Sequence, residues 1–354
     1  MKPSIHPRAS AFTLVEVLVS SAILVVILGF MLTVSDQTSR IMRSTTGKVE
    51  QFREARAGFE RITTRLSQAT LNTYWDYDNP TAPTRYERRS ELRFRSGDAQ
   101  ALLGNNGTKS RLGHCVFFNA PLGLVETDTY RGLGNVLNTV GYFIEYGDDK
   151  VLRPAFITEA IMPLKWRWRL MEFAQPTESF NVYKFTSGNS KNYNLTTWFK
   201  DAVNDTAKPI SRVMAENVVA LIITPRLSKA EETPLQGGNP DFSPLAKDYS
   251  YDSMSFNTDA RLNPRNQLPP IVQVTMVAID EKSAGRIAES DMLGIYDKTK
   301  FTNTADFTAD LSLDSTKTDS LEKKLVSLKA QYRVFTTKVH IRGAKWSTQQ
   351  TDTK

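Results

Sequence analysis

The sequence predicts an α+β protein in which a long N-terminal α-helix is packed on a mostly antiparallel β domain. Two observations carry this prediction. No proline interrupts the chain between Arg8 and Pro80, and from residue 91 onward short β-branched and aromatic segments are separated by glycine, proline, asparagine and aspartate. The chain has 354 residues, 40% of them hydrophobic and 23% charged, which is ordinary for globular domains and allows one large or two modest cores.

An apolar run at residues 14–34 has the length of a membrane-spanning helix, about 31 Å. Lys2 and Arg8 precede this run, and the positive charge predicts that the first residues stay in the cytoplasm while the rest of the chain lies outside it. The residues that follow, SDQTSRIMRS, contain no small-residue cleavage signal, so we do not expect a cleaved secretory signal peptide. Glu16 lies within the run, and an acid at the centre of a membrane helix costs about 2.5–3.5 kcal/mol, so its presence needs a reason.

The residues beyond the apolar run have the spacing of an amphipathic helix. Apolar side chains recur every three or four positions, at Val49, Phe52, Ala55, Phe59, Ile62, Leu66 and Ala69. The pattern predicts a nearly unbroken helix from Phe12 to Asn72, whose weakest points are its glycines Gly29, Gly47 and Gly58. The front half of this helix suits lipid, and the back half suits packing on a domain.

The remainder of the chain reads as strands with a few short helices. Alternating or β-branched segments predict strands at residues 91–95, 115–119, 140–146, 164–173, 217–225, 271–280 and 332–342. Segments 281–290 and 320–331 have the composition of short helices. Residues 184–211 and 228–266 are polar and rich in proline, asparagine and serine, so we expect long surface loops there.

Signatures of catalysis and of metal binding are missing from the sequence. It has no G-x-S-x-G, no H-E-x-x-H and no P-loop, so we expect neither an enzyme nor a cofactor. Cys115 is the single cysteine and lies in an apolar string, which predicts a buried, inert thiol. Aspartates at positions 306, 310, 314 and 319 are compatible with calcium, but their spacing is not that of an EF-hand and favours a solvated loop. No metal ion is therefore expected.

Two aromatic segments allow two interpretations each. In KWRWR (165–169) strict alternation predicts tryptophans in the core and basic side chains in water, and the alternative is a site for single-stranded nucleic acid or sugars. TYWDYD (73–78) fits packing where the helix meets the domain, and the alternative is an exposed adhesive surface. The net charge of +7 is mild and spread along the chain, so nucleic acid is not an expected partner.

The segment AFTLVE (residues 11–16) resembles the processing site of type IV prepilins and pseudopilins. Those chains have a short basic leader, a small residue that is usually glycine, then Phe-Thr-Leu-Ile-Glu and an apolar helix. Here Ala11 stands in place of the glycine and Val15 in place of the isoleucine. The resemblance implies a leader at 1–11, a membrane or filament-core helix at 12–34, an amphipathic helix at 35–72 and a β-rich domain at 73–354.

The resemblance also implies roles for the residues around the cleavage point. A membrane peptidase would cut between Ala11 and Phe12 and methylate the new Phe12 amine, which makes Glu16 the fifth residue of the mature chain. Thr13 and Glu16 are then the expected assembly residues. In a filament the Glu16 carboxylate would lie near the Phe12 amine of a neighbouring subunit, and the pair would neutralise charge in an apolar core.

Longer segments are similar to landmarks of the larger minor pilins and J-type minor pseudopilins, and more narrowly of the Verru_Chthon cassette protein C family. These segments are residues 51–69, 213–225, 268–281 and 332–346. The expected function is a filament subunit at the tip or in initiation, anchored in the bacterial inner membrane with its C-terminal domain in the periplasm. Its expected partners are prepilin peptidase, other pilin or pseudopilin subunits and the inner-membrane assembly machinery. The alternative is a membrane-anchored module that displays a binding domain for DNA, carbohydrate or a secreted substrate.

Overall fold

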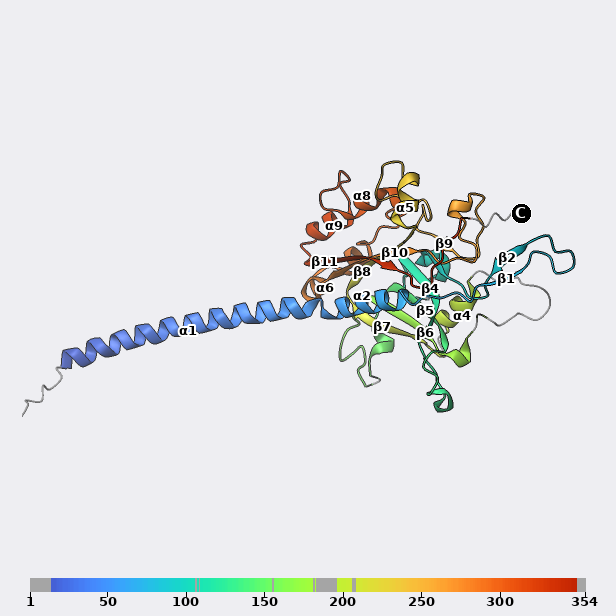
Figure 1. Ribbon diagram of the computed structural model, residues 1–354. Helices are drawn as coiled ribbons and strands as arrows, with labels where there is room; N and C mark the ends of the chain where they lie inside the picture. Colours follow the sequence, from blue (N-terminus) through green and yellow to red (C-terminus); the bar gives the residue numbers. More distant parts are fainter. Residues whose placement is uncertain are drawn as a thin grey trace, which may run out of the picture. The chain divides into compact units, whose positions relative to one another are not determined.

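The computed structural model describes residues 14–105, 107, 109–154, 156–180, 182, 196–205 and 208–348, and for residues 39–51 it describes the backbone alone. The chain divides into two compact units, Met1–Gln51 and Phe52–Lys354, here called unit 1 and unit 2. Figure 1 labels most of their helices and strands.

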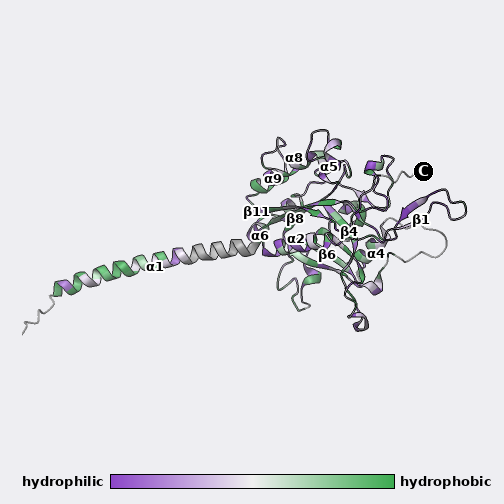
Figure 2. Cartoon of the chain, in the orientation of Figure 1, coloured by the Kyte–Doolittle hydropathy of each residue, from purple (hydrophilic) through white to green (hydrophobic). Residues whose placement is uncertain are grey.

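The described part of unit 1 is a single helix, α1 (Leu14–Gln51). Its segment Leu14–Thr38 is long and apolar enough to cross a membrane, by length and composition. Figure 2 shows the hydrophobic colour running along this segment. The few hydroxyl groups bond within the helix: Ser20 Oγ donates to the Glu16 carbonyl at 2.7 Å and Thr33 Oγ1 to the Gly29 carbonyl at 2.8 Å. Such back-bonding satisfies polar atoms where lipid offers no partner.

Unit 2 begins with helix α2 (Arg53–Leu66), which follows α1 after a break at Phe52. Its buried side is the predicted apolar stripe, formed by Ala55, Gly58, Phe59, Ile62 and Leu66. The helix ends at Leu66 rather than continuing to Asn72. The chain turns there toward the sheets, because the Thr70 amide donates to the Asn119 carbonyl and the Arg342 amide to the Ser67 carbonyl.

The largest sheet of unit 2 has the order β7-β6-β5-β4-β3-β9 and is antiparallel at each pairing. Its strands are β3 (Arg95–Asp98), β4 (His114–Pro121), β5 (Leu137–Gly147), β6 (Arg167–Gln175), β7 (Ser211–Glu216) and β9 (Tyr251–Asp252). Gly141 on β5 lies opposite Phe117 on β4, and a Cβ at Gly141 would be 2.1 Å from the Phe117 ring. Only glycine lets that ring lie across the neighbouring strand.

A second antiparallel sheet has the order β11-β10-β8, and a separate hairpin pairs β1 with β2. The strands are β8 (Val218–Arg226), β10 (Ile271–Ile279), β11 (Tyr332–His340), β1 (Tyr74–Tyr77) and β2 (Tyr86–Arg89). The remaining α-helices are α3 (Ala99–Leu103), α4 (Thr197–Asn204), α5 (Lys229–Glu232), α6 (Glu281–Arg286), α7 (Glu289–Leu293), α8 (Phe307–Leu311) and α9 (Leu321–Ser327). The 3₁₀ turns are η1 (Asp128–Tyr130), η2 (Lys150–Leu152), η3 (Thr177–Ser179), η4 (Thr233–Leu235), η5 (Ala260–Leu262) and η6 (Thr304–Asp306).

The six-stranded sheet is covered by apolar clusters on both faces. On one face it packs against α2 and the three-stranded sheet, in a cluster that includes Ile62, Trp168 and Val274. On the other face it packs against α3 and α4, where the Phe117 and Phe199 rings stack at 3.9 Å between centroids. The α+β prediction is confirmed: an N-terminal apolar helix precedes antiparallel sheets.

Several details of the sequence prediction are wrong. The strand expected at 91–95 begins only at Arg95, because Phe94 bonds to Ser253 through its amide and its carbonyl instead of joining a ladder. Residues 228–266 were expected to form a surface loop, but part of this segment lies in the core, since Tyr249 and Tyr251 are buried there. Within 184–211, the described residues 197–204 form α4. The pattern also missed the short strands β1, β2, β7 and β9.

Candidate functional site

Helix α1 carries the one predicted site residue whose position is described. Glu16 lies in the first turn of α1, where the partial positive charge of a helix N-terminus favours an acid. Around it the side chains of the helix are exposed within the chain, including Leu14, Val15 and Leu18. Ala11, Phe12 and Thr13 lie outside the described residues. Helix α1 is therefore an apolar helix whose described side chains are exposed and which has an acid in its first turn.

The KWRWR segment is structural. Trp168 on β6 is fully buried, and its indole N–H donates to the Met292 carbonyl at 2.9 Å. The basic side is not the open surface that alternation predicted: Arg169 is buried and lies 3.2 Å from a Glu216 oxygen, and Arg167 lies 3.1 Å from a Glu281 oxygen. Two of the three cations are therefore already paired, which argues against a nucleic-acid site here.

The TYWDYD segment does not pack where a helix meets the domain, so that prediction is wrong. Its residues form β1, which pairs with β2 alone and leaves Tyr74, Trp75 and Tyr77 exposed. The Tyr77 and Tyr86 rings stack at 4.9 Å between centroids, and the Arg88 guanidinium lies 5.7 Å from the Trp75 ring. These contacts hold the aromatic rings on an exposed hairpin, which agrees with the exposure, though not with any adhesion, expected in the alternative interpretation.

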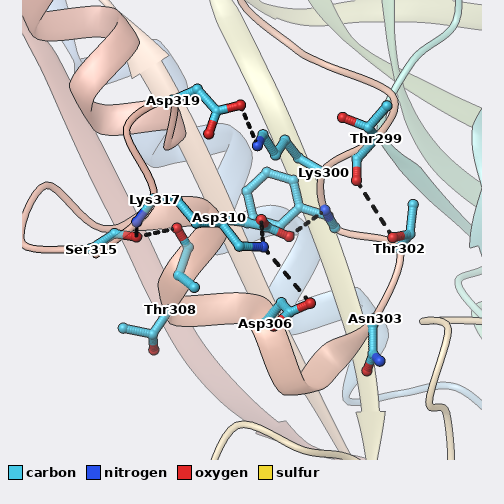
Figure 3. A network of polar contacts seen from close by, with 12 residues as sticks. Thr299, Lys300, Thr302, Asn303, Asp306, Thr308, Asp310, Ser315, Lys317 and Asp319 are labelled. Atoms are coloured by element: carbon cyan, nitrogen blue, oxygen red, sulfur yellow. Dashed lines mark hydrogen bonds and ion pairs between the residues drawn. The ribbon is translucent and has the colours of Figure 1, made fainter.

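Three of the four predicted acids, Asp306, Asp310 and Asp319, face lysines rather than one another (Figure 3). Lys317 Nζ lies 2.7 Å from an Asp310 oxygen and 3.7 Å from an Asp306 oxygen. The second oxygen of Asp310 accepts the Phe301 amide at 2.8 Å, and Lys300 donates to Asp319 at 2.5 Å. That bond from Lys300 lowers the pKa of Asp319. Within the described ranges no group of three potential metal-ligating side chains gathers, and the pairing favours a structural loop over a calcium site.

The single cysteine is buried, as predicted. Cys115 lies on β4 among the aromatic side chains between the six-stranded sheet and α4. Burial raises the pKa of its thiol far above the ordinary range, so the thiolate that reacts with electrophiles is not available at neutral pH.

Sequence reasoning missed a buried carboxylate that joins α2 to β6. Glu172 on β6 is buried, and one of its oxygens accepts bonds from Arg61 Nε at 3.0 Å, from Arg65 Nη1 and from the Tyr142 hydroxyl at 3.2 Å. Burial raises the pKa of Tyr142 well above its usual value. We call Glu172, Arg61, Arg65 and Tyr142 the helix clamp. The signal in the sequence was an acid between apolar neighbours, Met171-Glu172-Phe173.

Sequence reasoning also missed the buried imidazole of His114, which joins three segments of the chain. His114 on β4 accepts the amide of Ile223 on β8 at Nδ1, at 3.2 Å, and its Nε2 lies 3.1 Å from the Phe301 carbonyl. Because an amide only donates and a carbonyl only accepts, the ring is the neutral tautomer with its proton on Nε2. Burial lowers the pKa of His114 to about 4.

Comparison with protein families bears on the start of the chain. Residues 6–32 match the family model of the prokaryotic N-terminal methylation motif. The chain carries a prepilin-type N-terminal methylation motif. This motif covers Ala11, Phe12, Thr13 and Glu16 as well as the first half of α1. It supports a type IV pilin-like or pseudopilin precursor.

The methylation motif accounts for the exposed apolar surface of α1. In combination with the helix it indicates a protein anchored in the inner membrane, processed by a prepilin peptidase and assembled with pilin subunits. Unit 2 lies outside the methylation motif, and no curated protein or solved structure matches the chain.

Proposed function

We propose that the protein is a minor pilin-like or pseudopilin subunit of a type IV pilus or a type II secretion-like filament. The observation that carries this proposal is the prepilin-type methylation motif at residues 6–32, continuous with an apolar helix whose described side chains remain exposed. The helix anchors the precursor in the inner membrane with unit 2 in the periplasm, because Lys2 and Arg8 precede the span. The same helix then enters the filament. The role is structural rather than enzymatic.

We place the subunit at the tip of the filament or in its initiation. Unit 2 runs from Phe52 to Lys354 and carries two sheets, a hairpin and several short helices. A subunit of the shaft has to pack against neighbours at each helical step, and a domain of this bulk suits an end position better.

We assign the protein more narrowly to the larger minor pilins or J-type minor pseudopilins, and within them to the Verru_Chthon cassette protein C family. The segments that carry this resemblance form α2, β8, β10 and β11. These elements contribute to one apolar cluster, so the similarity follows the core of unit 2 rather than scattered surface loops.

A second candidate function is a display module whose domain binds DNA, carbohydrate or a secreted substrate. The hairpin β1–β2 favours it, because Tyr74, Trp75 and Tyr86 are exposed on a two-stranded element. Aromatic faces of this kind stack against sugar rings and bases. Filament assembly remains the better supported proposal, since it accounts for the methylation motif.

Processing gives the first test. The intact mass of the protein purified from membranes should show the loss of residues 1–11 and the gain of one methyl group, on the Phe12 amine. Ala11→Leu should block cleavage, because a bulky side chain replaces the small residue before the cut, while membrane insertion should persist. Ala22→Leu makes the same change within α1 and should be processed normally. A parent chain that keeps residues 1–11 in cells with an active prepilin peptidase would contradict the proposal.

Glu16 gives the second test. Glu16→Val and Glu16→Gln should be cleaved and membrane-resident but should fail to copurify with partner pilins, because the acid is needed only where a neighbour's Phe12 amine approaches it. Asp36→Asn removes an acid from the same helix at the other end of the span and serves as the matched control. If the Glu16→Val chain copurifies with partners as well as the parent, the carboxylate has no role in assembly.

A further inference from the structure

The connection between β5 and β6 exposes large apolar side chains. Over its described residues, 148–154 and 156–166, Val151 is 78% exposed, Phe156 76% and Ile161 72%. No other large apolar side chain in the described part of unit 2 is as exposed as these three. Leu152 and Met162 lie in the same connection and are also exposed. We call this connection the apolar loop.

The apolar loop is held in shape by its own polar groups. Arg153 is directed inward, where its Nε lies 2.9 Å from an Asp149 oxygen and its guanidinium donates to the carbonyls of Met162 and Pro163. The other Asp149 oxygen accepts the Lys165 amide at 2.9 Å. These bonds tie the beginning of the loop to its end. Arg153 and Asp149 are thus turned inward while the large apolar side chains are turned outward, the reverse of what water favours.

The apolar loop lies at the end of unit 2 where the chain arrives from α1. It leads directly into the start of β6 at Arg167. Gly58, near the start of α2, lies against Leu170, whereas Arg61 and Arg65 reach Glu172 farther along β6. Helix α2 and β6 therefore run in the same direction. The start of α2 and the apolar loop share one end of unit 2.

The chain limits how far this end of unit 2 can be from lipid. The candidate span ends at Thr38 and unit 2 begins at Phe52, with helical backbone between them. At 1.5 Å per residue this link is about 20 Å long. A short link of this kind keeps a surface at high effective concentration near the membrane.

The composition of the apolar loop suits a bilayer surface. Its most exposed side chains are aliphatic or aromatic. Exposed lysines flank them at Lys150, which pairs with Glu159 of the same loop at 3.0 Å, and at Lys165. Apolar groups that enter the headgroup boundary, next to lysines that meet anionic lipids, are the usual means of interfacial binding.

We propose that the apolar loop is a lipid-docking surface, which inserts Val151, Phe156 and Ile161 into the interface of an anionic bilayer. It holds unit 2 against the membrane before the subunit enters a filament. The inference rests on the membrane anchoring in the proposed function.

The test measures the depth of single probes in the full-length chain. Cys115 is buried and does not compete for thiol labelling, so cysteines are introduced one at a time at Phe156, Ile161, Tyr86 and Val25 and labelled with an environment-sensitive fluorophore. The protein is reconstituted in vesicles of phosphatidylethanolamine and phosphatidylglycerol with brominated acyl chains. Tyr86 is the first residue of β2, and Figure 1 shows β1 and β2 at the end of unit 2 away from the start of α2.

Quenching at positions 156 and 161 should exceed quenching at position 86 several-fold, and position 25 should be quenched most. Equal quenching at 156 and 86 with a quenched position 25 overturns the inference and leaves the anchoring intact. An unquenched position 25 overturns the anchoring itself. Protection of position 156 that depends on protein concentration, without quenching by lipid, indicates a protein partner and also overturns the inference.

A variant tests whether the exposed side chains are responsible. With a probe at position 152, the triple change Val151→Ser, Phe156→Ser and Ile161→Ser should reduce quenching to the level of position 86. The side chains are exposed, so folding should be unaffected. The control changes three other exposed apolar residues of unit 2, Leu133, Phe256 and Leu313, to serine and should leave quenching unchanged. Loss of quenching in both variants, or in neither, contradicts the role of the apolar loop.

Discussion

Replacing Glu172 with alanine should lower the free energy of unfolding of unit 2 by about 3 kcal/mol. The helix clamp has one buried carboxylate that accepts bonds from two arginines and a tyrosine, so its loss leaves several donors without their acceptor. Arg65 is mostly buried and cannot reach water freely, whereas Arg61 is half-exposed and can. This difference places the effect at the lower end of the range for broken buried ion pairs. Denaturant unfolding of the full chain in detergent, followed by tryptophan fluorescence, measures it.

Glu60→Ala is the matched control for the helix clamp. Glu60 lies on α2 and pairs with Arg56 at 2.9 Å, but both side chains are exposed. Exposed pairs contribute about 0–1 kcal/mol, so this variant should unfold at nearly the parent's denaturant concentration. The double change Glu172→Leu with Arg65→Met should cost less than Glu172→Ala, because it removes both buried charges and leaves only the half-exposed Arg61. Equal losses for Glu172→Ala and Glu60→Ala would show that the clamp does not stabilise the fold.

Lowering the pH from 6.5 to 4 should destabilise unit 2 by about 3 kcal/mol through His114 alone. The pKa of this group is about 4 in the folded protein and 6.5 when unperturbed. Between these values the unfolded chain takes up a proton that the folded chain does not, so stability falls as the pH falls. The slope is about 1.4 kcal/mol per pH unit. Protonation would also place a proton on Nδ1, where the Ile223 amide now donates.

His114→Gln separates this contribution from other titrations. Glutamine keeps one donor and one acceptor but does not titrate, so the variant should lose the slope between pH 6.5 and 4 even if it is less stable at pH 7. Burial raises the pKa of Glu232, which acts in the opposite sense and is common to both proteins. Unfolding free energies of the two proteins are compared at several pH values across this window. Parallel curves for parent and variant would refute the assignment to His114.

The parts of the fold that could be predicted are those with a strong local pattern. The stripe of α2 was found because a single helical face packs on the core, and β4, β5, β8, β10 and β11 were found because β-branched and aromatic residues run through them. Strand β2, of sequence YERR, and β7, of sequence SRVMAE, lack such a pattern. These strands form because a partner supplies hydrogen bonds, which depends on distant sequence. The break at Phe52 has no local signal either.

The candidate functional residues likewise divide into those that a local sequence pattern predicts and those that only the structure brings together. The motif from Ala11 to Glu16 is contiguous, so the residues carry it without any structure. The apolar loop could not be found from sequence, because Val151, Phe156 and Ile161 look like core residues until Arg153 is seen to turn inward. The helix clamp joins residues more than one hundred positions apart, Arg65 and Glu172, and only the packing of α2 on β6 brings them together.

The position of α2 has a consequence for the order of events during synthesis. Its apolar stripe is completed by a strand from near the other end of the chain: the Phe59 and Phe335 rings lie 5.6 Å apart, and the Arg342 amide bonds to Ser67. A ribosome makes α2 long before β11, so about 270 residues emerge between the end of this helix and its full partner. Folding of unit 2 is therefore a late event that waits for β11, and a chain stopped short of β11 leaves α2 exposed to chaperones and proteases.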